Sequence, residues 1–200
     1  REVGLVPDAR HGQNFLVDLN LVRILAEEAE VGPLDVVLEV GTGTGSLTGM
    51  LAENAAAVVT VELDHQLYQL AREELADCDN VVMLQQDALQ NKNRMDPAVL
   101  AAVREQLQRE PGRRFKLAAN LPYNIATPIL SNLLSTDIVP VSMTATIQKE
   151  LADRITARPS TKDYSALSIW MQALCDRRIL RILPPSVFWP RPKVHSAIVQ

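Results

Sequence analysis

A short apolar run that ends in a glycine-rich turn constrains the fold of this 200-residue chain more than any other feature. The run 36–40 has the length and the branched side chains of a buried strand, and three glycines spaced by two follow it at 41–45. Glycines there allow a tight turn and a close approach of the backbone to a ligand. The dinucleotide pattern G-x-G-x-x-G fails, because its last position would be Ser46 or Thr48. We therefore predict a strand–turn–helix unit with a ligand site at the turn.

Strand-like and helix-like runs alternate along the rest of the chain, which is typical of a parallel sheet covered by helices on both faces. Strands are predicted over residues 36–40, 58–63, 81–85, 115–119, 141–147, 178–183 and 197–200. Helices are predicted after the N-cap Asp18 and over 46–54, 66–75, 129–134, 149–157 and 165–174, with a helical pattern inside the link 90–114. The last two strands are expected to pair antiparallel. The predicted fold is one α/β domain over residues 1–200, with a doubly wound, Rossmann-like, seven-stranded, mostly parallel sheet and a terminal antiparallel strand.

The two halves of the chain carry opposite charge. Residues 1–89 hold 4 Lys/Arg and 16 Asp/Glu, a balance of −12, and residues 90–200 hold 16 and 8, a balance of +8; together they give the net charge of −4. Clustered cations favour contact with a polyanion. The link 90–114, taken with Lys116, contains seven of these basic residues. It is either an additional RNA contact or a solvated surface helix, and the sequence leaves both open.

Composition excludes several function classes. No apolar run approaches the roughly 20 residues that a membrane helix needs. Cys78 and Cys175 lack any CxxC spacing, and the three histidines form no cluster with them, so no metal site is expected. Unpaired thiols fit a reducing compartment, and we expect a cytoplasmic protein.

Acidic residues follow the next two predicted strands. Three glycines spaced by two after an acidic residue resemble the first motif of S-adenosylmethionine enzymes. Glu62, at the end of the second strand, could accept hydrogen bonds from the ribose hydroxyls of that cofactor, and Asp87, after the third, from its adenine amine. Strand ends converge on one crevice in an open α/β sheet. The sequence therefore predicts an S-adenosyl-L-methionine site at this edge.

The segment Asn120-Leu-Pro-Tyr123 follows the fourth predicted strand at the same edge. The exocyclic amine of adenine is a poor nucleophile, because its lone pair is delocalised into the ring. The side-chain carbonyl of Asn120 and the backbone carbonyl of Pro122 could each accept one amine hydrogen and draw the nitrogen toward tetrahedral geometry. Tyr123 offers a face on which an extruded base can stack. Positioning rather than a strong base would carry this chemistry.

Along almost its entire length the sequence resembles the KsgA-type ribosomal RNA small-subunit adenine dimethyltransferases. The resemblance lies in 11–16, 39–48, 61–64, 86–89, 120–128, 147–154 and 188–194. It implies a cofactor pocket formed by Gln13, Asn14, Leu16, Gly41, Gly43, Glu62, Asp87 and Asn120. It also implies a catalytic loop of Asn120, Leu121, Pro122 and Tyr123, with Phe188 as a second stacking face for the target base.

The same resemblance implies the substrate. The family transfers two methyl groups to each of two adjacent adenosines near the end of small-subunit ribosomal RNA, on a ribosome precursor. We expect a monomeric enzyme of this kind, without a metal and without a membrane partner. The family's small C-terminal helical domain is expected to be absent from this chain, which would leave substrate recognition incomplete.

Other functions remain open at this point. A related antibiotic-resistance type dimethylates large-subunit RNA with a similar loop, although the continuation 124–128 and the segment 188–194 favour the small-subunit type. Methylation of DNA adenine or of a protein glutamine is less favoured. A catalytically silent ribosome-assembly or transcription factor could share the fold, but the intact Asn120, Pro122, Tyr123 and Asp87 argue against lost catalysis.

Overall fold

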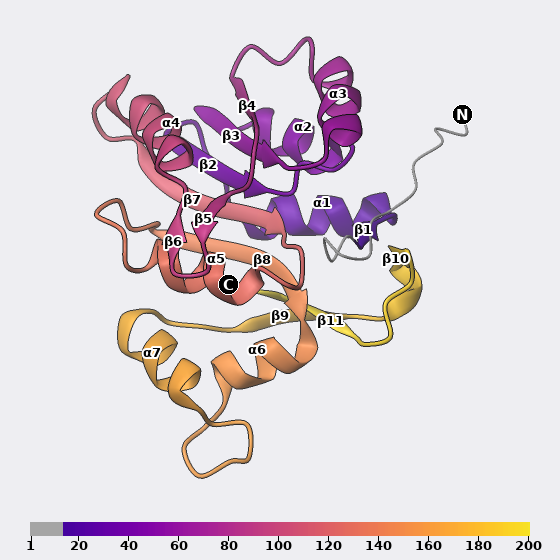
Figure 1. The fold of residues 1–200 in the computed structure, drawn as a ribbon, viewed down its shortest axis with the longest axis vertical. Coiled ribbons are helices and arrows are strands. Elements are labelled where there is room, and N and C mark those ends of the chain that lie inside the picture. The colour runs from indigo at the N-terminus through magenta and orange to yellow at the C-terminus, as the bar shows by residue number, and fades with distance from the viewer. Residues whose placement is uncertain (1–13) are drawn as a thin grey trace.

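The computed structural model describes residues 14–200, and within them it confirms the predicted α/β class (Figure 1). Seven strands form one sheet in the order β4-β3-β2-β7-β8-β11-β9. They are β2 (Asp35–Val40), β3 (Ala57–Glu62), β4 (Val81–Gln85), β7 (Arg114–Asn120), β8 (Ser142–Gln148), β9 (Ile179–Leu183) and β11 (Ser196–Val199). The helices are α1 (Leu19–Glu28), α2 (Ser46–Ala52), α3 (His65–Glu74), α4 (Pro97–Gln108), α5 (Ala126–Leu133), α6 (Lys149–Thr156) and α7 (Ala166–Leu174).

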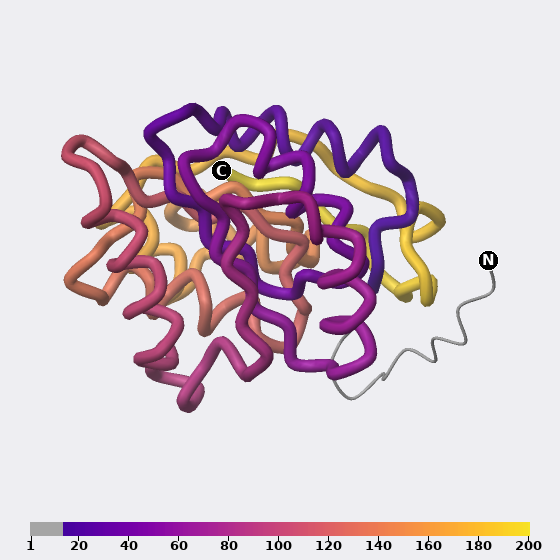
Figure 2. The backbone as a smooth tube through the Cα atoms, turned by 90° about the horizontal axis from the view of Figure 1, so that it is seen from above, coloured from indigo at the N-terminus to yellow at the C-terminus, as the bar shows by residue number. Residues whose placement is uncertain are grey.

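The strand directions agree with the prediction. Strands β4, β3, β2, β7 and β8 pair parallel, whereas β11 is antiparallel to both of its neighbours, β8 and β9. The expected pairing of the last two strands is therefore confirmed, with the antiparallel strand one place in from the edge. Viewed from above, β11 is the yellow segment that lies within the body of the molecule (Figure 2).

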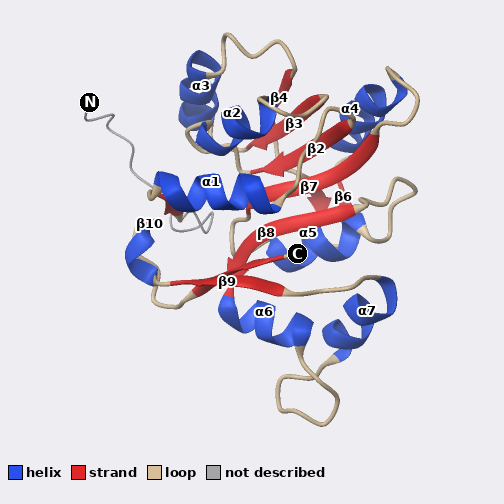
Figure 3. Ribbon diagram, turned by 180° about the vertical axis from the view of Figure 1, so that it is seen from behind, coloured by secondary structure: helices blue, strands red, loops and turns tan. Residues whose placement is uncertain are grey.

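The sheet separates two hydrophobic cores, because successive residues of a strand point to opposite faces. Val36, Leu38 and Val40 of β2 pack into the core that α4, α5, α6 and α7 cover, and Val37 packs into the core under α1 and α2. Figure 3 shows α1 and α5 on opposite sides of the strands. Burial of both faces explains why four of the six residues of β2 are apolar and do not alternate with polar ones.

Local signals fix the helix starts. The Asp18 carboxylate accepts a hydrogen bond from the Asn20 amide and confirms the predicted N-cap of α1. The Asp64 side chain does the same for α3, and Asp96 precedes a proline at the start of α4. Within the described residues no helix is both long and apolar enough to cross a membrane.

Four short strands were not predicted from the sequence. β1 (Phe15–Leu16) pairs antiparallel with β10 (Phe188–Trp189), and β5 (Leu89–Asn91) forms a hairpin with β6 (Arg94–Met95) inside the link 90–114. Elements of two or three residues are too short to show a period, which is why neither pair was predicted. A 3₁₀ turn, η2 (Pro185–Val187), precedes β10.

An ion cluster around the buried Asp35 holds α1 against the sheet at the edge away from the glycine turn. Asp35 is fully buried and forms ion pairs with Arg114, at 2.8 Å, and with Lys116, at 3.1 Å. The Lys116 ammonium also donates to the carbonyls of Ala29 and Glu30, just beyond the end of α1. A cation at a helix C-terminus interacts favourably with the helix dipole, so this lysine serves both the carboxylate and the helix.

Candidate active site

A cleft lies at the edge where the parallel strands β2, β3 and β7 end, and most of the predicted site residues border it. Its lining includes Asn14, Phe15, Gly41, Gly43, Glu62, Leu63, Gln86, Asp87, Ala88, Asn120, Pro122, Asn124 and Ile125. Three predicted features separated in sequence, the glycine turn, the two carboxylates and the Asn120 loop, therefore meet at one place. Gln13 lies outside the described residues, and its predicted role remains a prediction.

The glycine turn requires glycine for two reasons. Gly41 has a φ of 86°, and a Cβ on it would come within 3.4 Å of the Pro122 ring. Gly45 has a φ of 85°, and a Cβ there would lie 3.2 Å from the side chain of Leu75 at the end of α3. L-residues with side chains rarely adopt such φ values. The turn therefore lies directly against the Asn120–Tyr123 loop and leaves its backbone open to the cleft.

Glu62 is the last residue of β3 and is almost fully buried at the cleft. One carboxylate oxygen accepts a hydrogen bond from the Gly43 amide at 2.9 Å, and the other accepts from the Asp64 amide at 3.0 Å. Burial raises the pKa of this carboxyl, and the two amide donors partly offset the rise. Each oxygen has a second lone pair. The side chain is therefore held rigidly and can still accept bonds from a ligand.

Asp87 follows β4 and also borders the cleft. Its Oδ1 accepts a hydrogen bond from the Leu89 amide at 2.9 Å, which stabilises the turn that leads into β5. The carboxylate has further lone pairs for a ligand donor. Its position is the one that the sequence predicted.

A buried hydroxyl network, which was not predicted from the sequence, lies beneath the glycine turn. Glu39 is 1% exposed, and its Oε2 accepts from the hydroxyls of Thr48, at 2.5 Å, and Thr60, at 2.8 Å. The Thr42 and Thr60 hydroxyls lie 2.6 Å apart. Burial raises the pKa of Glu39 to about 8, helped by the nearby Glu62, and the two threonine hydrogen bonds oppose the rise. Glu39 is therefore mostly protonated and neutral at pH 7.

Asn120, the last residue of β7, has a fixed orientation. Its Nδ2 donates to the Asn14 backbone carbonyl at 3.0 Å, so a flipped amide would place two oxygens against each other. The other end of the amide, Oδ1, is buried and has no hydrogen-bond partner in the described part of the protein. A buried acceptor without a partner is costly, typically about 1–3 kcal/mol. An amine that enters the cleft would supply the missing donor.

The three predicted residues that follow Asn120 lie in different environments. Pro122 borders the cleft, but its carbonyl already accepts from the Ile125 amide at 3.1 Å, which leaves one lone pair for a ligand. Leu121 is buried in the core, where its side chain cannot touch a ligand. Tyr123 is half-buried, and its hydroxyl lies 2.5 Å from the Ser196 hydroxyl. Burial raises the pKa of this phenol, so it stays protonated.

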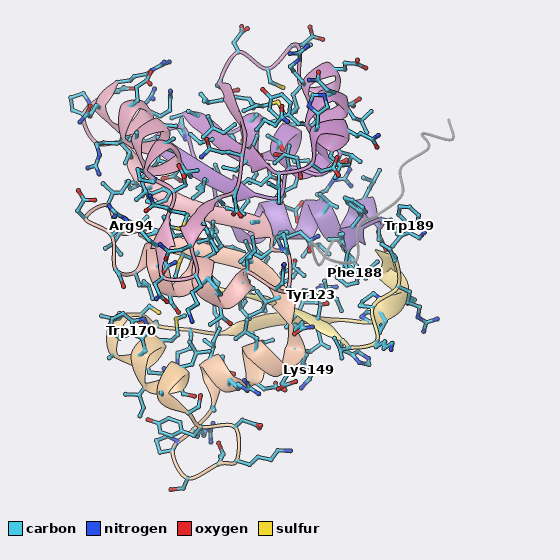
Figure 4. All side chains as sticks on the ribbon, in the orientation of Figure 1. Arg94, Tyr123, Lys149, Trp170, Phe188 and Trp189 are labelled. Atoms are coloured by element: carbon cyan, nitrogen blue, oxygen red, sulfur yellow. The ribbon has the colours of Figure 1, made fainter. Side chains whose placement is uncertain are left out.

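Three aromatic residues, Tyr123, Phe188 and Trp189, lie on the same side of the molecule (Figure 4). The rings of Phe15 and Trp189 stack with centroids 6.2 Å apart and planes 25° apart, and Trp189 is exposed. Leu16 pairs with Phe188 in the β1–β10 ladder, and Leu16 lines a shallow hollow beside the cleft together with Asn120. Phe188 itself is 3% exposed, so its ring offers no free face in this conformation. Its stacking role remains a prediction that requires the ring to move.

Phe15 is the main cleft residue that sequence reasoning missed. Its ring contacts the position where a Cβ on Gly43 would stand, at 3.6 Å, and so it lies over the glycine turn. The available signal was its place directly between Asn14 and Leu16, both of which were predicted as site residues.

The basic link 90–114 is largely neutralised. Arg104 pairs with Asp137, Arg109 with Glu105, and Arg113 with Glu110. Arg114 and Lys116 pair with Asp35, as described above. Lys92 and Arg94 are exposed on the β5–β6 hairpin. These pairs favour the interpretation of a solvated surface helix for α4, with the hairpin as the part that presents cations. Among the described residues no cluster of His, Cys, Asp or Glu could hold a metal.

Comparison with solved structures shows to which class of protein this fold corresponds. The fold matches a dimethyladenosine transferase from Plasmodium falciparum with a TM-score of 0.77 and 26% identity, over 92% of this chain and 62% of that one. It matches the 23S rRNA methyltransferase ErmE with a TM-score of 0.73 and 28% identity, over 92% and 68% of the two chains. The chain thus has the fold of these methyltransferases.

Sequence comparison narrows the class to one family. The ribosomal RNA adenine dimethylase family matches residues 8–200, and the chain belongs to that family. It is 41% identical to Ribosomal RNA small subunit methyltransferase A of Moorella thermoacetica, over 100% of this chain and 68% of the relative. It is 43% identical to the protein of the same name from Lactiplantibacillus plantarum, over 94% and 61%. The chain thus spans about two thirds of the length of these curated relatives.

Proposed function

We propose that this protein transfers methyl groups from S-adenosyl-L-methionine to the N6 amine of adenosines in small-subunit ribosomal RNA. The observation that carries the proposal is the buried Asn120 Oδ1, which has no donor among residues 14–200 and lies beside the glycine turn of a methyltransferase cleft. Family membership and the name shared by the bacterial relatives support the substrate.

The cleft fits the cofactor. Glu62 and Asp87 present carboxylate oxygens from two neighbouring strand ends, and Gly41 and Gly43 keep the backbone open between them. The Asn14 and Asn120 side chains complete the border of the site. Ribose hydroxyls and an adenine amine are donors that such acceptors can bind. When bound, S-adenosylmethionine supplies a methyl group on a positively charged sulfur.

The residues of the chain would act mainly by positioning. Asn120 Oδ1 accepts one hydrogen of the target amine, and the free lone pair of the Pro122 carbonyl can accept the other. Together they draw the nitrogen lone pair out of conjugation with the ring. These bonds strengthen as the amine becomes tetrahedral, so they favour the transition state over the ground state. Tyr123 provides a stacking face, and its protonated hydroxyl excludes a negative charge from the site.

We further propose that residues 1–200 form the catalytic domain of a monomeric enzyme that acts in the cytoplasm, where ribosomal RNA matures. Arg191 and Lys193 are exposed in the segment after β10, and Lys92 and Arg94 on the hairpin. These exposed cations would serve as phosphate contacts. In the longer relatives, further contacts would come from the part of those proteins that lies outside the matched residues.

The test is incubation with labelled cofactor and three acceptors: undermethylated small subunits, undermethylated large subunits, and DNA. We expect label at N6 of small-subunit adenosines. The structural similarity to ErmE makes large-subunit RNA the second candidate. Label on large subunits alone would replace the proposed substrate, and cofactor binding without label on any acceptor would support the silent factor.

A further inference from the structure

Ser196 lies at a fixed point of the sheet next to the active site. It is the first residue of β11, where it pairs with Gln148 of β8 on one side and Leu183 of β9 on the other. Its side chain is fully buried. Because two ladders hold its backbone, the position of the Ser196 hydroxyl depends little on neighbouring side chains.

The hydroxyl of Ser196 bonds to the far end of Tyr123. The two oxygens are 2.5 Å apart, although the residues are 73 positions apart in sequence. The backbone around Tyr123 is held separately, by the Leu121 amide on the Thr146 carbonyl at 3.2 Å and the Ile125 amide on the Pro122 carbonyl at 3.1 Å. The aromatic ring is thus fixed at both ends and cannot swing about its side-chain torsions without breaking a hydrogen bond.

A fixed ring matters for the transfer of a methyl group to a stacked base. The amine of a base that stacks on Tyr123 has to meet Asn120 Oδ1, which is itself fixed by its bond to the Asn14 carbonyl. Misplacement by about 1 Å can cost as much as a hundredfold in rate. A tyrosine that is half-buried but free to rotate would present its face at variable distances from that oxygen.

We propose that Ser196 is a positioning residue for methyl transfer, which holds the Tyr123 ring at the distance from Asn120 that presents the target amine. The inference rests on the proposed function and adds to it a residue on the antiparallel strand, outside the catalytic loop. Ser196 does not contact the base; it acts through Tyr123.

The test is a double-mutant cycle with Ser196→Ala, Tyr123→Phe and the double variant in the purified protein. Both substitutions remove only a hydroxyl. We expect each single variant to lower the single-turnover rate of methylation about tenfold, the typical effect of one positioning hydrogen bond. The double variant should be no slower than the slower single variant, because both changes break the same bond. Affinity for the cofactor should not change in any of them.

Ser168→Ala is the matched control. Ser168 is also fully buried and hydrogen-bonded, to the Arg154 carbonyl and the Ser165 amide, but it lies in α7, away from the cleft. It should lose stability and keep the parental methylation rate. A loss of rate equal to that of Ser196→Ala would mean that stability alone explains the effect, and would overturn the proposal.

Two further results would overturn it: Ser196→Ala at the parental rate, or rate losses that multiply in the double variant. If Ser196→Ala does not fold, Tyr123→Phe removes the same bond from the other side, and a parental rate there is equally decisive. Failure of the proposed function looks different, since the parental protein would then methylate none of the three acceptors. The double-mutant cycle therefore tests the role of Ser196 only if the parental protein methylates one of the acceptors.

Discussion

Replacing Glu39 by glutamine should change how the stability of this protein depends on pH. The carboxyl lies beneath the glycine turn, and its Oε2 accepts the hydroxyls of Thr48 and Thr60. A glutamine can keep that acceptor, because one amide oxygen can receive both bonds. Its amide nitrogen replaces the second carboxyl oxygen without a charge. Glu39→Gln therefore mimics the protonated acid at every pH.

The magnitude follows from the shifted pKa. Burial raises it from 4.5 to about 8, so between these values the folded state holds a proton that the unfolded state has released. The stabilisation is fully present below 4.5 and is lost as the pH rises through 8. The free energy of unfolding falls by about 1.4 kcal/mol per pH unit in this window. Over the whole interval the loss is roughly 5 kcal/mol, an upper limit if the turn relaxes around the ionised group.

Urea unfolding of the parental protein and Glu39→Gln, from below pH 4.5 to above pH 8, measures the effect. The difference in unfolding free energy should grow with pH in favour of the glutamine variant and level off above 8. The exposed Glu73→Gln serves as the matched control, with no comparable growth. Parallel curves for Glu39→Gln and the parental protein would show that Glu39 is ionised in the fold, and would refute the reasoning.

The remaining predictions concern the cleft and the ion cluster. Glu62→Ala and Asp87→Ala should each weaken cofactor binding about ten- to hundredfold by calorimetry, the effect of losing a charged hydrogen-bond partner, and unchanged affinity in both would remove the basis of the cofactor assignment. Asn120→Ala should slow single-turnover methylation by about a hundredfold or more, whereas a parental rate would exclude the proposed role of Oδ1. Lys116→Met should lower the unfolding free energy by about 3 kcal/mol, because it leaves the buried Asp35 with one cation instead of two; a loss too small to measure would mean that Arg114 alone neutralises the carboxylate.

Much of the fold followed from the sequence because its strands are buried on both faces. The apolar run of β2 and the glycine turn after it were recognisable without any tertiary information, and so were the acids at the ends of the next two strands. The short ladders β1–β10 and β5–β6 were not, since two or three residues carry no periodicity. Helix α5 begins at Ala126, three residues before the predicted start, because the pattern was counted from the first strongly apolar residue.

The sequence predicted which residues form the candidate site better than it predicted the contacts between them. Spacing alone placed Asn120 at the sheet edge, but it could not indicate that the carbonyl of Asn14, 106 positions away, fixes its amide. Phe188 shows the same limit: the sequence could not indicate that its ring is packed into the core beside the site, and its stacking role remains a prediction. Contacts of this kind depend on how separate segments fold together, which local sequence does not encode.

The position of β11 affects the order in which the sheet can be completed. β9 precedes β11 in the chain, yet β11 lies between β8 and β9, so β9 has no place in the sheet until the later strand arrives. Until β11 has been synthesised, the edge of β8 therefore has unpaired backbone groups. Such an edge can pair wrongly with another chain. Chains that terminate before Ser196 should keep the parallel half of the sheet, expose this edge and aggregate. The four residues of β11 thus cover the edge of β8 and keep it from pairing with other copies of the chain.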